Sequence, residues 1–173
     1  MVKQIYPRVE VNLQYLKENV AAVVQRCGEF GIDIAGVIKG TTGIPECAKM
    51  FQEGGAKMIA SSRLEQIEDA KEYGIDLPYL LLRVPMLSEL PEVVRLTDIS
   101  LNSEVEVLKA LNEEAGKQGK LHKVILMADL GDLREGFWDK DEMVDVAVMV
   151  ENEMKNLILG GVGTNLGCYG SIE

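Results

Sequence analysis

The run Ile34-Ala35-Gly36-Val37-Ile38-Lys39-Gly40-Thr41-Thr42-Gly43 is apolar up to one amine, which small and flexible residues follow. A strand without polar residues is typical of parallel sheets, because helices bury such strands on both faces. Ligands bind at the carboxyl ends of these strands, so Lys39 is predicted to lie at the mouth of a sheet or barrel. Apolar walls there would favour the neutral, nucleophilic amine. Position alone favours the alternative of a lysine that extends from a strand end into water.

The rest of the chain alternates short apolar runs with amphipathic stretches. Asn12 is predicted to cap the first helix, and Ser103 with Glu106 is predicted to form a capping box for a later one. Strict alternation implies right-handed parallel crossovers, in a doubly wound open sheet or a (β/α)8 barrel. The barrel is favoured because neither a G-x-G-x-x-G fingerprint nor a Walker A loop follows Lys39. The predicted strands are 8–11, 34–38, 57–60, 79–84, 98–101, 123–129 and 157–162, and the predicted helices are 12–27, 44–52, 63–73, 88–96, 103–117 and 139–154.

The length of the chain points to an incomplete barrel. A closed (β/α)8 barrel needs eight strands and about 250 residues, whereas this chain has 173 residues. The fold predicted is therefore an incomplete (β/α)8 TIM-type barrel of about six parallel strands with flanking helices. Residues 1–173 are expected to be the N-terminal part of a longer protein. Two open sheet edges should make this part unstable unless it pairs with a partner or with the missing part.

Composition excludes several classes of function. The formal net charge of −10 argues against binding to nucleic acids or to anionic membranes. No stretch of about 18 apolar residues could span a membrane. The three cysteines, Cys27, Cys47 and Cys168, are widely spaced and fit a reducing cytoplasm. His122 is the single histidine, so neither a zinc site nor any other metal site is expected.

Four stretches that end strands are predicted to meet at the mouth of the barrel, because catalytic groups of barrels come from several strand ends. The four stretches are 39–41, 82–84, 129–136 and 160–167. Arg83 either lines the mouth or neutralises glutamates on neighbouring helices, and the second interpretation is favoured.

Two side chains in these stretches have two readings each. Arg134 either forms a surface ion pair with Asp129, Asp132 or Glu135, or donates to an anionic oxygen of a ligand. Asn165 lies in a glycine-rich loop that could form the floor of a cofactor site, or it merely braces the turn.

At Ala35-Gly36-Val37-Ile38-Lys39-Gly40 the chain resembles the alanine racemase family, whose fold-type III enzymes use pyridoxal 5′-phosphate on a (β/α)8 barrel. The resemblance covers essentially the whole chain and includes the opening Arg8-Val9-Glu10-Val11-Asn12-Leu13. The loops Asp129-Leu130-Gly131-Asp132-Leu133-Arg134-Glu135-Gly136 and Gly163-Thr164-Asn165-Leu166-Gly167-Cys168-Tyr169-Gly170 look closest to the branch of ornithine and other amino-acid racemases.

The resemblance implies a racemase mechanism. Lys39 would form the internal aldimine with pyridoxal 5′-phosphate and act as one of two bases that exchange the α-proton of an amino acid, preferably a basic one such as ornithine. Arg134 matches the arginine that hydrogen-bonds the cofactor phenolate, and Asn165 takes a cofactor-binding place. The second base in the family is a tyrosine from a C-terminal β domain of the partner subunit, so a homodimer is implied.

Two positions depart from the family pattern. Family alanine racemases have a tyrosine four residues after the lysine, where this chain has Gly43. They have a histidine stacked on the pyridine ring, where this chain has Asn165. Both departures argue against a simple transfer of alanine specificity.

Two other functions stay open. One is a non-catalytic barrel that binds pyridoxal 5′-phosphate in cofactor homeostasis. The other is a sugar-phosphate barrel in which Lys39 forms an aldolase-like imine and pyridoxal is not involved.

Overall fold

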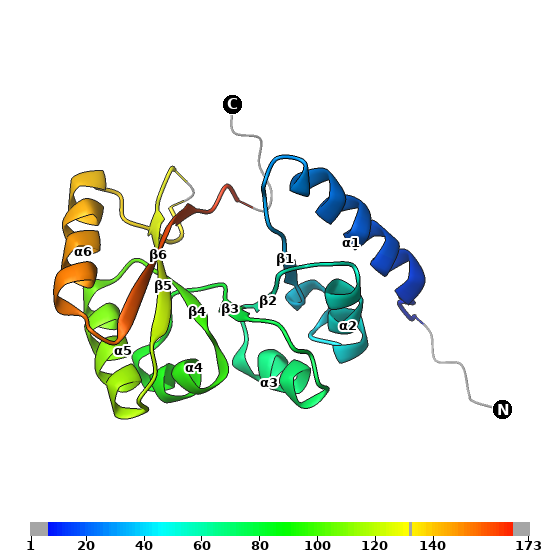
Figure 1. Cartoon of the computed structure of the whole chain (residues 1–173), viewed down its shortest axis with the longest axis horizontal. Helices are drawn as coiled ribbons and strands as arrows, with labels where there is room; N and C mark the ends of the chain where they lie inside the picture. The colour runs from blue at the N-terminus through cyan, green and yellow to red at the C-terminus, as the bar shows by residue number, and fades with distance from the viewer. Residues whose placement is uncertain (1–6, 132, 168–173) are drawn as a thin grey trace.

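A computed structural model describes residues 7–131 and 133–167 of the chain. Six parallel strands form one sheet in the order β1-β2-β3-β4-β5-β6. Consecutive strands are neighbours and helices connect them, which confirms the predicted alternation (Figure 1). The strands are β1 (Ala35–Val37), β2 (Met58–Ser61), β3 (Tyr79–Leu81), β4 (Ile99–Asn102), β5 (His122–Ala128) and β6 (Leu157–Thr164). The helices are α1 (Leu13–Gly28), η1 (Lys39–Thr41), α2 (Pro45–Glu53), α3 (Leu64–Glu72), η2 (Leu87–Glu89), α4 (Leu90–Leu96), α5 (Val105–Lys117) and α6 (Lys140–Glu153).

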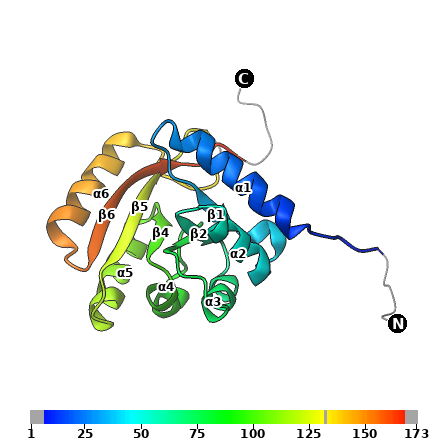
Figure 2. The same cartoon turned by 45° about the vertical axis from the view of Figure 1, so that its right-hand side comes forward.

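The main hydrophobic core lies between the sheet and its helices. Ile59, Leu81 and Val124 are fully buried there, because alternate residues of each strand face the helices. Figure 2 shows α3, α4, α5 and α6 along the outside of the curved sheet. The backbone of β1 comes so close to α2 that a Cβ on Gly36 would lie 2.6 Å from the Phe51 ring. This close approach fixes β1, which ends just before Lys39, against α2.

The opposite face of the sheet carries a smaller cluster. Ala60, Leu80 and Ile99 are buried in it. Two residues of the edge strands are more exposed. Val37 of β1, which pairs with Ala60, is 38% exposed, and Ile158 of β6 is 42% exposed. Apolar burial on the inner face thus weakens toward the two edge strands, as expected for an open barrel wall.

Two local predictions need correction, and a third is confirmed. Residues 8–11 do not form a strand, since β1 pairs only with β2 in the described sheet, and Val9 is 93% exposed. Ser103 and Glu106 do not form a capping box, because the extended residue Glu104 occupies the N-cap of α5 and makes no side-chain capping bond. The cap at Asn12 is confirmed, since its side chain accepts a hydrogen bond from the Tyr15 N–H at 3.0 Å.

His122 belongs to a buried polar group between β4 and β5. Its side chain is 1% exposed, and Nε2 lies 2.9 Å from the Ser100 Oγ. The same hydroxyl accepts a hydrogen bond from Asn102 Nδ2 at 3.0 Å. Burial lowers the pKa of His122 to about 4, because the imidazolium would lose its hydration.

Stability is therefore expected to fall as the pH drops from 6.5 toward 4. The unfolded state takes up a proton at the ordinary histidine pKa of 6.5, whereas the folded state does so only near pH 4. Because the unfolded state binds more protons in this range, the free energy of unfolding decreases with falling pH. A pKa difference of about 2.5 corresponds to a loss of about 3 kcal/mol. Urea unfolding at pH 7 and pH 4 measures it, and a His122→Gln variant should lose this part of the pH dependence. An identical dependence in the variant would contradict the assignment.

Candidate active site

Lys39 lies directly after β1, at the carboxyl end of the parallel sheet. It opens the short helix η1, which follows a fully buried Ile38. The Ile38 carbonyl accepts hydrogen bonds from the Thr41 N–H at 3.1 Å and from the Gly43 N–H at 3.0 Å. These bonds close the turn and fix the backbone that presents the amine. The Lys39 carbonyl accepts a hydrogen bond from the Thr42 N–H at 3.2 Å, whereas its side-chain amine makes no hydrogen bond and no ion pair with the residues that the structure describes.

The apolar walls expected around Lys39 are not seen. Both Lys39 and the preceding Val37 are exposed. The physical reason is that β1 is a three-residue edge strand, so β2 covers it on one side only. In the described part of the chain, Lys39 is thus an accessible amine at the rim.

The glycine at position 43 is required by its surroundings. Its φ is +79°, and a Cβ there would lie 2.5 Å from the Gln66 Cγ. Gln66 cannot easily move away, because its Oε1 accepts a hydrogen bond of 2.6 Å from the buried Ser61 hydroxyl. Position 43 therefore leaves no room for a tyrosine side chain.

The loop after β5 is pinned at both ends. The Phe137 N–H donates to the Met127 carbonyl at 2.8 Å, and the Asp129 N–H donates to the Phe137 carbonyl at 3.0 Å. The buried Asp129 carboxylate accepts hydrogen bonds from the N–H groups of Gly131 at 2.8 Å and Leu133 at 3.2 Å. Asp132, which the sequence offered as a partner of Arg134, lies outside the described residues, as do Cys168, Tyr169 and Gly170.

Arg134 and Asn165 meet the same carboxylate. Arg134 Nη2 lies 3.6 Å from the Glu135 Oε1, which also accepts a hydrogen bond of 2.9 Å from Asn165 Nδ2. The Asn165 Oδ1 accepts a hydrogen bond from the Gly167 N–H at 3.0 Å. The structure thus brings together two of the three predicted site residues, through Glu135.

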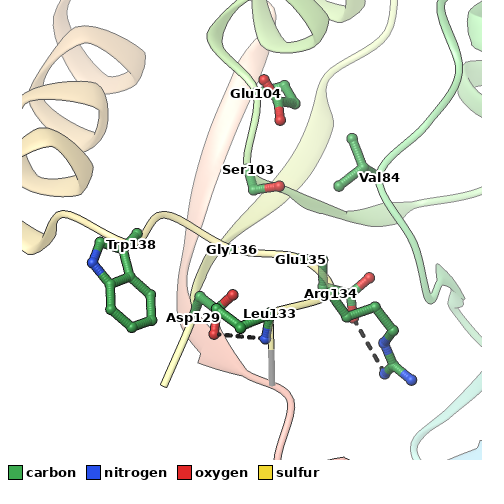
Figure 3. Close-up of a pocket in the computed structure, with 9 residues that line it drawn as sticks. All are labelled: Val84, Ser103, Glu104, Asp129, Leu133, Arg134, Glu135, Gly136 and Trp138. Atoms are coloured by element: carbon green, nitrogen blue, oxygen red, sulfur yellow. Dashed lines mark hydrogen bonds and ion pairs between the residues drawn. The ribbon is translucent and has the colours of Figure 1, made fainter. Parts of the chain in front are cut away.

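A pocket of about 510 Å³ opens at the carboxyl ends of β3, β4 and β5, and Figure 3 shows its lining. In that view Trp138 and Arg134 lie at its two ends. Neither Lys39 nor Asn165 is among the residues that line this pocket. Lys39 follows β1, which lies at the far end of the strand order from β5 and β6. The lining residues are Val84, Ser103, Glu104, Asp129, Leu133, Arg134, Glu135, Gly136 and Trp138.

Arg83 does not enter the pocket lining. Its Nε donates to the Ser62 carbonyl at 2.7 Å, and its Nη2 lies 2.8 Å from the Glu89 Oε2. This confirms its interpretation as a partner of a glutamate on a neighbouring helix.

Sequence reasoning missed the role of Glu135. The sequence presents this residue only as one possible partner of Arg134, yet its side chain is 13% exposed and contacts residues that follow two different strands. A carboxylate next to an arginine gives no signal in the sequence that an amide thirty positions later will meet it.

The described helices are short or amphipathic compared with membrane-spanning ones. None of them combines the length and the apolar character that a membrane-spanning helix needs.

Comparisons with known proteins agree on one family. The sequence model described as "Alanine racemase, N-terminal domain" matches residues 11–173. The chain is 37% identical to a lysine racemase from Thermotoga maritima, over 97% of this chain and 46% of the relative. It is 33% identical to an ornithine racemase from Acetoanaerobium sticklandii, over 97% of this chain and 47% of the relative. The chain thus spans about half the length of the curated relatives it matches.

A solved structure extends the likeness to the fold. An alanine racemase from Clostridium difficile 630 superimposes with a TM-score of 0.77 at 23% identity, over 91% of this chain and 41% of that one. This match, together with the six parallel strands, confirms the predicted barrel type.

Proposed function

Because the chain belongs to the family of alanine racemase N-terminal domains, we propose that it forms the N-terminal part of a pyridoxal 5′-phosphate-dependent amino-acid racemase. The observation that carries the proposal is the placement of Lys39 at the carboxyl end of β1, as an accessible amine on a closed turn. The homologues of the chain named above are amino-acid racemases.

The described residues fit such a cofactor. A primary amine, a guanidinium and an amide are presented at the same end of one parallel sheet, by Lys39, Arg134 and Asn165. An amine without a partner is free to react with an aldehyde, and a guanidinium is a permanently charged donor for an anionic oxygen.

When bound, pyridoxal phosphate supplies an aldehyde for amines and an electron sink for the charge left at the α-carbon. The proposed work of Lys39 is to anchor the cofactor and then to move the α-proton on one face of the substrate. Arg134 would hold the phenolate oxygen, and Asn165 would face the cofactor from the end of β6. Exchange on the opposite face requires a second base, which the family resemblance assigns to a tyrosine of the partner subunit in a homodimer.

A basic amino acid is the proposed substrate. The two relatives named above are a lysine racemase and an ornithine racemase. The pocket beside Arg134 supports this choice, because three carboxylates, those of Glu104, Asp129 and Glu135, line it against one guanidinium. Such a lining favours a cationic side chain over an apolar one.

The test is an assay of D/L interconversion by the intact protein with ornithine, lysine, alanine and serine. We expect kcat/KM for ornithine or lysine to exceed that for alanine by at least roughly tenfold, the value of one charged hydrogen bond. The visible absorbance of bound cofactor is recorded on the same samples. Equal rates for alanine and ornithine would contradict the substrate class. Cofactor absorbance without interconversion of any amino acid would support the non-catalytic alternative instead.

A further inference from the structure

The Glu135 carboxylate links two segments of the candidate site. Its Oε1 accepts the 2.9 Å hydrogen bond from Asn165 Nδ2 and lies 3.6 Å from Arg134 Nη2. The Glu135 side chain is 13% exposed, whereas that of Arg134 is 46% exposed. A carboxylate so shielded interacts more strongly with its partners than a fully solvated surface pair does.

Both polar ends of the Asn165 amide are occupied. Nδ2 donates to Glu135, and Oδ1 accepts from the Gly167 N–H at 3.0 Å. Two hydrogen bonds in opposite directions fix the plane of the amide as well as its position. Nδ2 keeps a second N–H and Oδ1 keeps a second lone pair, so the oriented amide can still meet a ligand through its polar edge or its flat face.

The position of Glu135 is itself well determined. Gly136 follows it with a φ of +126°, and a Cβ there would lie 2.4 Å from the Asp129 backbone nitrogen. Lys140 Nζ donates to three carbonyls of the same loop, those of Asp129 at 2.7 Å, Phe137 at 3.1 Å and Trp138 at 2.8 Å. The carboxylate is thus held by a loop that these contacts keep in one conformation.

We infer that Glu135 is a positioning residue, which orients the Asn165 amide plane and anchors the Arg134 guanidinium before the cofactor binds. The inference rests on the proposed function, because it assigns the two oriented side chains to the cofactor. Pre-organisation of this kind lowers the entropy cost of binding, since the side chains need not be ordered when the ligand arrives.

A double-mutant cycle on the intact protein tests the inference. Glu135→Ala is expected to raise the dissociation constant of pyridoxal 5′-phosphate about tenfold, as the loss of one charge-assisted hydrogen bond does. Glu135→Gln keeps the shape and an acceptor oxygen, so a smaller increase is expected. In an Asn165→Ala background the same Glu135→Ala change should cost less than about threefold, because its hydrogen-bond partner is already gone and only the 3.6 Å contact with Arg134 remains.

A matched control is available at Glu89. This glutamate is also paired with an arginine, Arg83, at 2.8 Å, but in the described structure it does not contact Asn165. Glu89→Gln should leave the dissociation constant unchanged and should show no coupling to Asn165→Ala. Additive effects of Glu135→Ala and Asn165→Ala would overturn the inference.

A second readout needs no cofactor. The side-chain amide resonances of Asn165 in the cofactor-free protein should shift on Glu135→Gln and stay in place on Glu89→Gln. Unmoved resonances on Glu135→Gln would contradict the orienting contact. A protein that shows this shift but does not bind pyridoxal 5′-phosphate would overturn the proposed function, and with it the cofactor-directed role of Glu135.

Discussion

Replacing Lys39 with alanine is expected to remove covalent attachment of pyridoxal phosphate and to lower the racemisation rate by about 10³-fold or more. The reason is that one amine is proposed to serve both as the anchor of the cofactor and as a proton carrier. No other residue of η1 carries an amine, since Gly40 and Thr41 follow. Visible absorbance and the D/L interconversion assay measure the two losses separately.

Lys57→Ala is the matched control for this substitution. Lys57 is also exposed, but it precedes β2 and therefore lies at the opposite end of the parallel strands. Its removal should leave absorbance and rate unchanged. Equal losses in the Lys39 and Lys57 variants would mean that Lys39 acts only as a surface charge.

Gly136→Ala is expected to have the largest effect on stability among the loop glycines. A Cβ at this position would lie 2.4 Å from the Asp129 nitrogen and 2.7 Å from the Ala128 carbonyl carbon, and both atoms are backbone. The φ of +126° adds strain of its own. Together these costs should lower the free energy of unfolding by about 3 kcal/mol and displace the segment that carries Arg134. Urea unfolding measures the loss in the free energy of unfolding. A weaker affinity for the cofactor reports the displacement of the segment that carries Arg134.

Gly131→Ala separates strain from contact in the same loop. Gly131 also has a positive φ, of +114°, but nothing lies within 4 Å of the position of its Cβ. The free energy of unfolding of this variant should therefore fall only by the cost of the backbone conformation, about 1 kcal/mol. Equal losses in the two variants would show that the close approach to Asp129 is unimportant.

Much of the fold was predictable because the chain marks its elements clearly. Apolar runs identified β1 to β6 within about three residues at each end, since glycine and proline interrupt the pattern between them. The run 8–11 failed for a reason that no local pattern contains. Val9 and Val11 alternate as a strand would, but in the described sheet no neighbouring strand is there to pair with them.

The candidate site was predictable only in part. The end of an apolar run placed Lys39 at the rim, because strand direction follows from the alternation of elements. Its exposure did not follow, since burial of a strand end depends on which strands stand beside it. The meeting of Glu135 with Asn165 depends on the register of β5 against β6, which includes an irregularity between Val124 and Ile125. Such a register is set by tertiary packing and cannot be read from the residues one by one.

Borohydride reduction of the intact protein with bound pyridoxal phosphate, followed by peptide mass mapping, tests the central claim most directly. Reduction converts a covalent bond between an amine and the cofactor aldehyde into a stable one, so the labelled lysine identifies the anchor. The proposal predicts that the label is on the peptide that contains Lys39 and on that residue. A label on any other lysine, or a protein that takes up no label although cofactor is bound, would contradict it.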